Sequence, residues 1–129
     1  MKSKANDNLK SAQILIDAEQ YTTSIHCSYY AVLEYMKYML AKMEIKPINY
    51  ENQNSNIGAD THTFILDEIK NRIKNPKNAR NFVEGVRLLK RERVQADYEL
   101  RQFSDVESLD CIQNASGLIM NLKTYFGNL

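Results

Sequence analysis

The segment from Arg91 to Tyr98 holds the side chains of this chain that are best suited to chemistry on a phosphate. It reads Arg-Glu-Arg-Val-Gln-Ala-Asp-Tyr, so two guanidinium groups, a carboxylate and a phenol fall close together. Guanidinium groups bind phosphate oxygens through paired hydrogen bonds, and a tyrosine ring can stack on a base. Such a cluster indicates either a contact with nucleic acid or an ion pair that serves the fold.

A helix over residues 78–101 would divide these side chains between two faces. Its apolar stripe consists of Phe82, Val86, Leu89, Ala96 and Leu100. Arg93 falls in the middle of that stripe, and Asp97 lies one turn later, so the two can form an ion pair. Arg91 and Tyr98 lie on the opposite face. The pattern therefore predicts two polar sites on opposite sides of one helix.

Two interpretations of these residues remain open. In the first, Arg93 and Asp97 form a buried or interfacial ion pair that fixes the register of the helix against its neighbours or across a dimer. In the second, Arg91, Arg93 and Tyr98 form a phosphate-contacting cluster.

Basic residues are concentrated in the same part of the chain. Residues 70–101 contain ten Lys/Arg and four Asp/Glu, whereas the whole chain has a net charge of only +1. Such asymmetry suits an anionic partner, and the alternative is a solvated helix face. We place the candidate nucleic-acid contacts at Arg91, Lys90 and Arg87.

Length and composition predict one domain over residues 1–129, since a chain of 129 residues can bury a core without disulfides or metal. Cys27 and Cys111 lack CxxC spacing, which is typical of reduced core thiols in a cytoplasmic protein. The N-terminus lacks the apolar segment of a signal peptide, and no stretch is apolar enough to span a membrane. We expect a cytoplasmic protein without a cofactor.

Apolar spacing predicts helices over residues 3–18, 22–44, 61–74, 78–101 and 104–126, and no segment alternates as a strand would. Thr22-Thr23-Ser24 offers a cap for the second helix, Asp60 or Thr61 caps the third, and Ser104-Asp-Val-Glu107 forms a capping box for the last. The polar run 49–60 is predicted to be a long loop. The fold class is all-α, an antiparallel four-helix bundle with an additional short helix.

Both histidines lie outside the arginine-rich segment. His26 stands beside Cys27, which is weak evidence for metal, so we interpret it as a packing residue and predict no metal site. His62 opens the third helix beside the polar run, where it can act as an exposed acid or base near the arginines, or simply as a solvated or capping residue.

Four tyrosines are spread around the second predicted helix, at Tyr29, Tyr30, Tyr35 and Tyr38. Because they point in different directions, some are expected to leave the core. Aromatic residues on a bundle surface often mark a subunit interface, so we expect a homodimer.

In order along the chain, four segments resemble the HEPN-domain superfamily, which includes prokaryotic toxins paired with nucleotidyltransferase-like antitoxins. The segments are residues 4–18 with Tyr21-x4-His26-Cys-Ser-Tyr-Tyr-Ala31, then Thr61-His62-Thr63, Arg93-Val-Gln-Ala-Asp97-Tyr98 and residues 104–126. The third segment resembles the RxxADY signature of one branch of small stand-alone members.

The resemblance implies metal-independent RNA cleavage by an arginine followed, four to six residues later, by a histidine and then often a tyrosine. With Arg91 and Tyr98 at the outer positions, Ala96 stands where the histidine is expected, and alanine transfers no proton. Asp97 is a possible base but would be held by Arg93, which leaves His62 as the stand-in. The candidate catalytic residues are Arg91, Arg93, Asp97, Tyr98 and His62.

Two functions follow. The resemblance favours the toxin-like or RNA-binding half of a two-gene module, in the enzymatic case a metal-independent endoribonuclease. Its partner would be a nucleotidyltransferase-like antitoxin, for which Tyr98 is a possible target of nucleotide transfer. The missing histidine and the near-neutral charge favour instead a non-catalytic helical adaptor or dimerisation protein.

Overall fold

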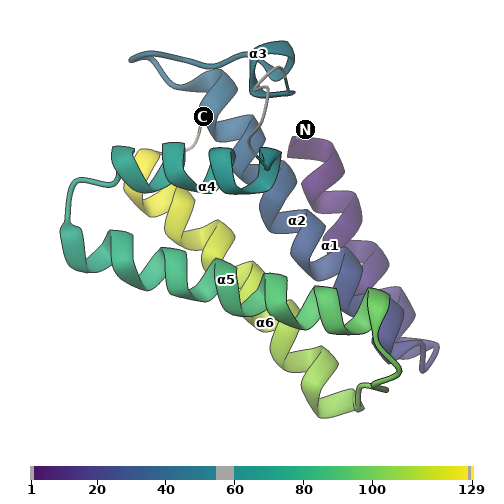
Figure 1. The fold of residues 1–129 in the computed structure, drawn as a ribbon. Coiled ribbons are helices and arrows are strands. Elements are labelled where there is room, and N and C mark those ends of the chain that lie inside the picture. The colour runs from purple at the N-terminus through teal and green to yellow at the C-terminus, as the bar shows by residue number, and fades with distance from the viewer. Residues whose placement is uncertain (1, 55–59, 128) are drawn as a thin grey trace.

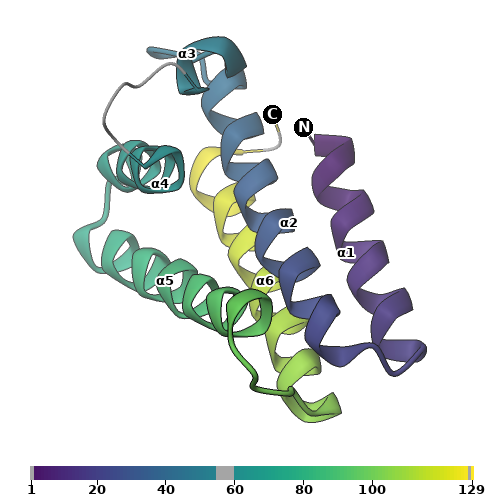
Figure 2. The same ribbon diagram turned by 45° about the vertical axis from the view of Figure 1, so that its right-hand side comes forward.

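The computed structural model describes residues 2–54, 60–127 and 129, and this part of the chain forms six helices and no strand (Figure 1). The helices are α1 (Lys2–Asp17), α2 (Tyr21–Lys42), α3 (Tyr50–Asn54), α4 (Thr61–Arg72), α5 (Pro76–Tyr98) and α6 (Asp105–Phe126). The all-α prediction is confirmed, with α1, α2, α5 and α6 as the four long helices. In Figure 2, α1 runs antiparallel to α2, α6 runs in the same general direction as α2, and α5 crosses them obliquely.

The centre of the molecule is α2, which packs against α1, α4, α5 and α6. A helix that is covered on so many sides must be apolar nearly all round. Tyr29 and Tyr35 are only 1% exposed, and Tyr30 and Tyr38 are partly buried against the same core. Tyr29 and Tyr35 are therefore core residues, whereas Tyr30 and Tyr38 keep part of their surface exposed, so that some of the four leave the core as expected; the homodimer stays a prediction.

Local sequence explains most helix starts. Asp60 caps α4 by accepting from the His62 backbone N–H, and Asn75 caps α5, with Pro76 in its first turn. The predicted capping box at Ser104 and Glu107 is present. The predicted cap of α2 is wrong, because α2 begins at Tyr21 and residues 22–24 already lie within its first turn.

The polar run 49–60 contains a short helix, α3, that the sequence pattern did not predict. Asn49 caps its first turn by accepting from the Asn52 backbone N–H. Gln53 is fully buried, and its amide donates to the backbone oxygens of Lys37 and Ile48, which fastens α3 to the end of α2. Residues 55–59 of the predicted loop lie outside the described residues.

The apolar stripe of α5 is shorter than predicted. Because α5 ends at Tyr98, Leu100 lies beyond the helix and is fully exposed instead of belonging to the core. On α6, Leu109 is partly exposed, and the buried face consists of Ser108, Cys111, Ala115, Leu118, Ile119 and Leu122. Cys111 is buried and Cys27 is partly buried, and both are free thiols. Among the described helices, none is long and apolar enough to cross a membrane.

Candidate functional site

Arg93 is a buried cation on the inner face of α5, as the helical periodicity predicts. The residue is 7% exposed. Its guanidinium carbon lies 5.1 Å from the centre of the Tyr29 ring and 5.6 Å from that of Tyr30. Its Nη1 donates to Oδ2 of Asp97 over 3.4 Å. The geometry of the i,i+4 ion pair is therefore present, and two tyrosine faces from α2 enclose the charge.

One donor of Arg93 is left over. Its Nε is buried and has no hydrogen-bond acceptor among the described residues. Burial opposes the charged form, but the Tyr30 phenol and the Asp97 carboxylate outweigh it and raise the pKa of Arg93. The guanidinium is therefore a permanent positive charge with unused hydrogen-bonding capacity.

His26 belongs to the same cluster. Its Nδ1 lies 2.8 Å from Oδ2 of Asp97, and its ring stacks on Tyr30 with centroids 4.5 Å apart. The side chain is 44% exposed. The interpretation of His26 as a packing residue is therefore incomplete, because its imidazole bridges α2 to the end of α5. The available signal was its spacing: positions 26, 29 and 30 share one face of α2.

His62 approaches the cluster from the start of α4. Its Nδ1 lies 2.9 Å from the Tyr29 hydroxyl, and its ring packs edge-on against Tyr30 at 5.9 Å. Burial lowers the pKa of His62, and the positive charges of Lys90 and Arg93 lower it further against the opposing effect of Asp60. At neutral pH this imidazole is therefore predominantly neutral and can accept a proton.

A small cavity opens beside His62, between α2, α4 and α5. It has a volume of about 80 Å³, and its lining includes Tyr29, His62, Arg87 and Lys90. Lys90 lies at its edge, with Nζ 3.1 Å from the Asp60 carboxylate. Burial raises the pKa of Asp60, but the hydrogen bonds from Lys90 and the His62 backbone outweigh this effect and hold it below the usual range. Cations therefore border the space next to the neutral imidazole.

The candidate catalytic residues predicted from the sequence fall into two groups in the structure. Arg93, Asp97 and His62 come together, joined by His26, Tyr29 and Tyr30. We call these six residues the histidine–arginine cluster. Arg91 lies exposed on the other side of α5, and Tyr98 is 74% exposed at its end. The prediction of two polar sites on opposite faces of this helix agrees with that placement.

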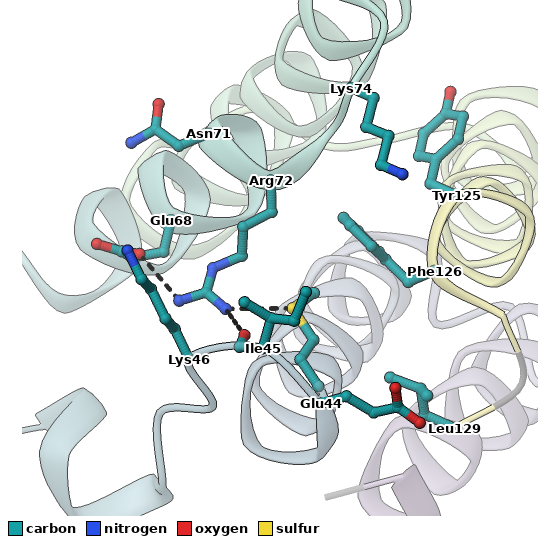
Figure 3. A pocket seen from close by; sticks show the side chains of 11 residues that line it. Glu44, Ile45, Lys46, Glu68, Asn71, Arg72, Lys74, Tyr125, Phe126 and Leu129 are labelled. Carbon is teal, nitrogen blue, oxygen red and sulfur yellow. Dashed lines mark hydrogen bonds and ion pairs between the residues drawn. The ribbon is translucent and has the colours of Figure 1, made fainter.

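A larger hollow lies elsewhere, between the C-terminal ends of α2, α4 and α6 (Figure 3). Its volume is about 760 Å³, and Met43, Ile45 and Phe126 contribute apolar walls. Arg72 donates to the Ile45 backbone oxygen and pairs with Glu68. The lining residues include no histidine, so this hollow lacks the acid–base groups of the histidine–arginine cluster. Within the described residues, no group of His, Cys, Asp and Glu could hold a metal ion.

The arrangement of the cluster suits proton transfer at two points. Each imidazole has Nδ1 engaged, in His26 by a carboxylate and in His62 by a phenol, which leaves Nε2 for a substrate. Both rings contact Tyr30, and the Arg93 guanidinium carbon lies 5.6 Å from the centre of the same Tyr30 ring. Two acid–base groups beside a cation are what phosphodiester cleavage needs.

Comparison with known families agrees with the fold. The family model for the HEPN domain matches residues 1–125, so the chain belongs to the HEPN domain family. Neither the curated proteins nor the solved structures gave a match. Membership of this family suggests a nuclease, toxin-like or RNA-binding role.

Proposed function

We propose that this HEPN protein binds RNA and cleaves it without a metal ion, at the histidine–arginine cluster. One observation carries the proposal: two imidazoles from different helices, each with one nitrogen already engaged, contact the Tyr30 ring, over which the buried Arg93 guanidinium also lies. In this proposal the cluster supplies the proton-transfer group that is missing at Ala96.

His62 is the general base in this proposal. Its lowered pKa keeps the ring neutral, and in the tautomer whose Nδ1–H donates to the Tyr29 hydroxyl, Nε2 is free to take the proton of a ribose 2′-hydroxyl. The 2′-oxygen then attacks the adjacent phosphorus, and the bond from phosphorus to the 5′-oxygen breaks. The products are a 2′,3′-cyclic phosphate and a 5′-hydroxyl.

His26 is the general acid. Asp97 accepts the Nδ1–H of His26, which orients the ring and directs Nε2 away from the carboxylate. The protonated ring gives its Nε2 proton to the departing 5′-oxygen, so that one proton is taken up and one released. Exchange with water restores both rings for the next turnover.

Arg93 has two roles in the proposal. It holds Asp97, and so His26, in position through the 3.4 Å contact from Nη1. Its charge also stabilises the phosphorane as negative charge develops on the phosphate oxygens. Arg87 and Lys90, at the cavity beside His62, are the cations that meet the substrate phosphate directly.

We further propose that the protein is the toxin-like half of a two-gene module and acts as a homodimer with a nucleotidyltransferase-like antitoxin. Tyr98 supports the proposed antitoxin partner, because a phenol that is 74% exposed is open to nucleotide transfer by a nucleotidyltransferase-like protein. Modification at Tyr98 would add charge at the end of α5, one residue after Asp97.

A second candidate function, a non-catalytic adaptor, is favoured by one specific observation. The Arg93 side chain is 9% exposed and is paired with Asp97, which is also how a purely structural ion pair would look. In that case the two histidines would serve packing and capping alone.

Incubation of purified protein with a labelled pool of structured RNA in excess chelator separates the two functions. If the protein is a ribonuclease, we expect cleavage that leaves 2′,3′-cyclic phosphate ends. We also expect the cleavage rate to fall at least 100-fold in His26→Ala and in His62→Ala, with the helical circular dichroism signal unchanged. The absence of cleavage of any RNA by folded protein would contradict the proposal and favour the adaptor.

A further inference from the structure

The outward face of α5 carries a straight row of polar side chains that is separate from the histidine–arginine cluster. Arg80, Arg87, Arg91 and Tyr98 follow one another at spacings of seven, four and seven residues. These spacings are close to two, one and two helical turns, so the four side chains share one face. All four are exposed. We call this row the α5 ridge.

We propose that the α5 ridge binds the backbone of single-stranded RNA, with the three arginines on phosphates and Tyr98 stacked on a base. This inference rests on the proposed function, since it names the form of RNA that the protein takes and the surface that holds it.

The arginines of the ridge differ from the other arginines of the chain. Of the six arginines, Arg72, Arg93 and Arg101 each pair with a carboxylate. The three on the ridge form no ion pair within the described part of the chain. Glu84 lies on the same face but makes no ion pair there either. Unpaired guanidinium groups on one line are available to successive phosphates.

The dimensions of the ridge suit a nucleic-acid strand. From Arg80 to Tyr98 it extends about 27 Å, and the arginines are separated by about 10 Å and about 6 Å along the helix. A stacked strand carries a phosphate every ~3.4 Å, so these steps correspond to about three and about two nucleotides. In Figures 1 and 2, α5 lies at the outside of the bundle, and the four residues of the ridge are exposed along its length.

Tyr98 favours a single strand over a duplex and over an acidic protein. An exposed phenol in line with three arginines offers a stacking surface, and only an unpaired base can stack on it. An acidic protein segment would make use of the charges but has no need of the ring.

The ridge also leads to the proposed cleavage site. Arg87 is both a member of the ridge and part of the lining of the small cavity that contains His62 and Lys90. A strand that follows the ridge therefore passes the edge of that cavity. The same strand can then place one ribose near His62.

Binding is best measured with a 2′-O-methyl oligoribonucleotide, which has no 2′-hydroxyl and so cannot be cleaved. A fluorescein-labelled strand is titrated with protein by anisotropy at several salt concentrations, beside the same strand in a duplex. The test variant is Arg80→Gln/Arg87→Gln/Arg91→Gln. The matched control is Lys4→Gln/Lys10→Gln/Lys42→Gln, which removes the same charge from exposed positions on α1 and α2.

We expect the arginine variant to weaken binding at least tenfold more than the lysine variant. We also expect it to reduce the slope of log K against log salt concentration by about two, since each phosphate contact with a single strand contributes ~0.7. Tyr98→Ala is expected to weaken binding about tenfold without changing the slope, and Tyr98→Phe to bind as the wild type does. Equal loss in the arginine and lysine variants would overturn the proposal, as would duplex binding equal to single-strand binding. Competition by polyglutamate as strong as that by RNA would favour an acidic protein and overturn it too.

The outcome for the ridge is independent of catalysis. If the protein binds RNA as predicted but cleaves no RNA, the proposed role of the α5 ridge is supported and the proposed ribonuclease activity is refuted. Cleavage that all ridge variants retain at unchanged Kd would refute the ridge alone.

Discussion

His26 and Asp97 are separated by 71 residues in sequence, yet Nδ1 of the imidazole lies 2.8 Å from Oδ2 of the carboxylate. The same carboxylate oxygen accepts from Arg93 on the other side. Asp97, in the last turn of α5, therefore ties that helix to α2 through His26 and is itself held by Arg93 one turn earlier. This shared acceptor makes Asp97 a positioning residue for both partners.

Arg93 and Arg91 provide a matched pair of arginines for testing the structural part of this relationship. Arg93→Ala should lower the free energy of unfolding by about 3 kcal/mol, because it removes a buried cation from two tyrosine faces and leaves Asp97 without that partner. Arg91→Ala, at an exposed position on the same helix, should change it by less than about 0.5 kcal/mol. Urea denaturation measures both, and equal losses would contradict the buried placement of Arg93.

Stability should depend on pH through His62. Burial lowers the pKa of His62 in the folded chain, whereas the unfolded chain titrates near the ordinary value of about 6.5. Between these values the unfolded chain binds more protons, so the free energy of unfolding rises with pH. The stabilisation is present above about pH 6.5 and is lost as the pH falls toward the folded pKa.

Urea midpoints at pH 5.5 and 7.5 test this dependence. The wild type should be less stable at the lower pH, and His62→Gln should lose most of that difference because glutamine does not titrate. An unchanged difference in His62→Gln would show that another group is responsible.

Two helical glycines give a test of packing between α5 and α6. A Cβ added to Gly117 meets no atom within 4 Å, so Gly117→Ala should raise the free energy of unfolding by about 1 kcal/mol. A Cβ on Gly85 would lie 2.8 Å from Cδ2 of Leu118, which must move aside. Gly85→Ala should therefore gain clearly less. Thermal melts rank the two variants, and the reverse order would mean that α5 and α6 are less closely packed here.

Periodicity was enough to predict five of the helices and the burial of Arg93. It could not place Leu100, because α5 ends at Tyr98, three residues before the predicted end of the helix. It also did not predict α3, whose Asn-rich sequence has little helix propensity and which is held by the buried amide of Gln53. Its position depends on tertiary hydrogen bonds that no local pattern records.

The candidate site was less predictable than the fold. Arg93 and Asp97 share a helix, so their pairing follows from spacing alone. The contacts of His26 with Asp97 and of His62 with Tyr29 cross between helices, over 71 and 33 residues. The tyrosines of α2 indicate from the sequence that this helix is central, since an aromatic helix that is apolar all round belongs in the centre of a bundle.

The central claim is that His62 acts as the base and His26 as the acid. It is tested most directly by measuring kcat/KM on two substrates in the presence of a metal chelator. One is a dinucleotide with an ordinary 5′-oxygen leaving group, and the other is a nucleoside 3′-(4-nitrophenyl phosphate), whose leaving group needs no proton. The proposal predicts that His26→Ala loses at least 100-fold in kcat/KM on the dinucleotide but recovers to within about tenfold of wild type on the nitrophenyl ester. His62→Ala should be impaired on both. Equal impairment of His26→Ala on the two substrates, or activity of His62→Ala on either at the wild-type level, would contradict the assignment.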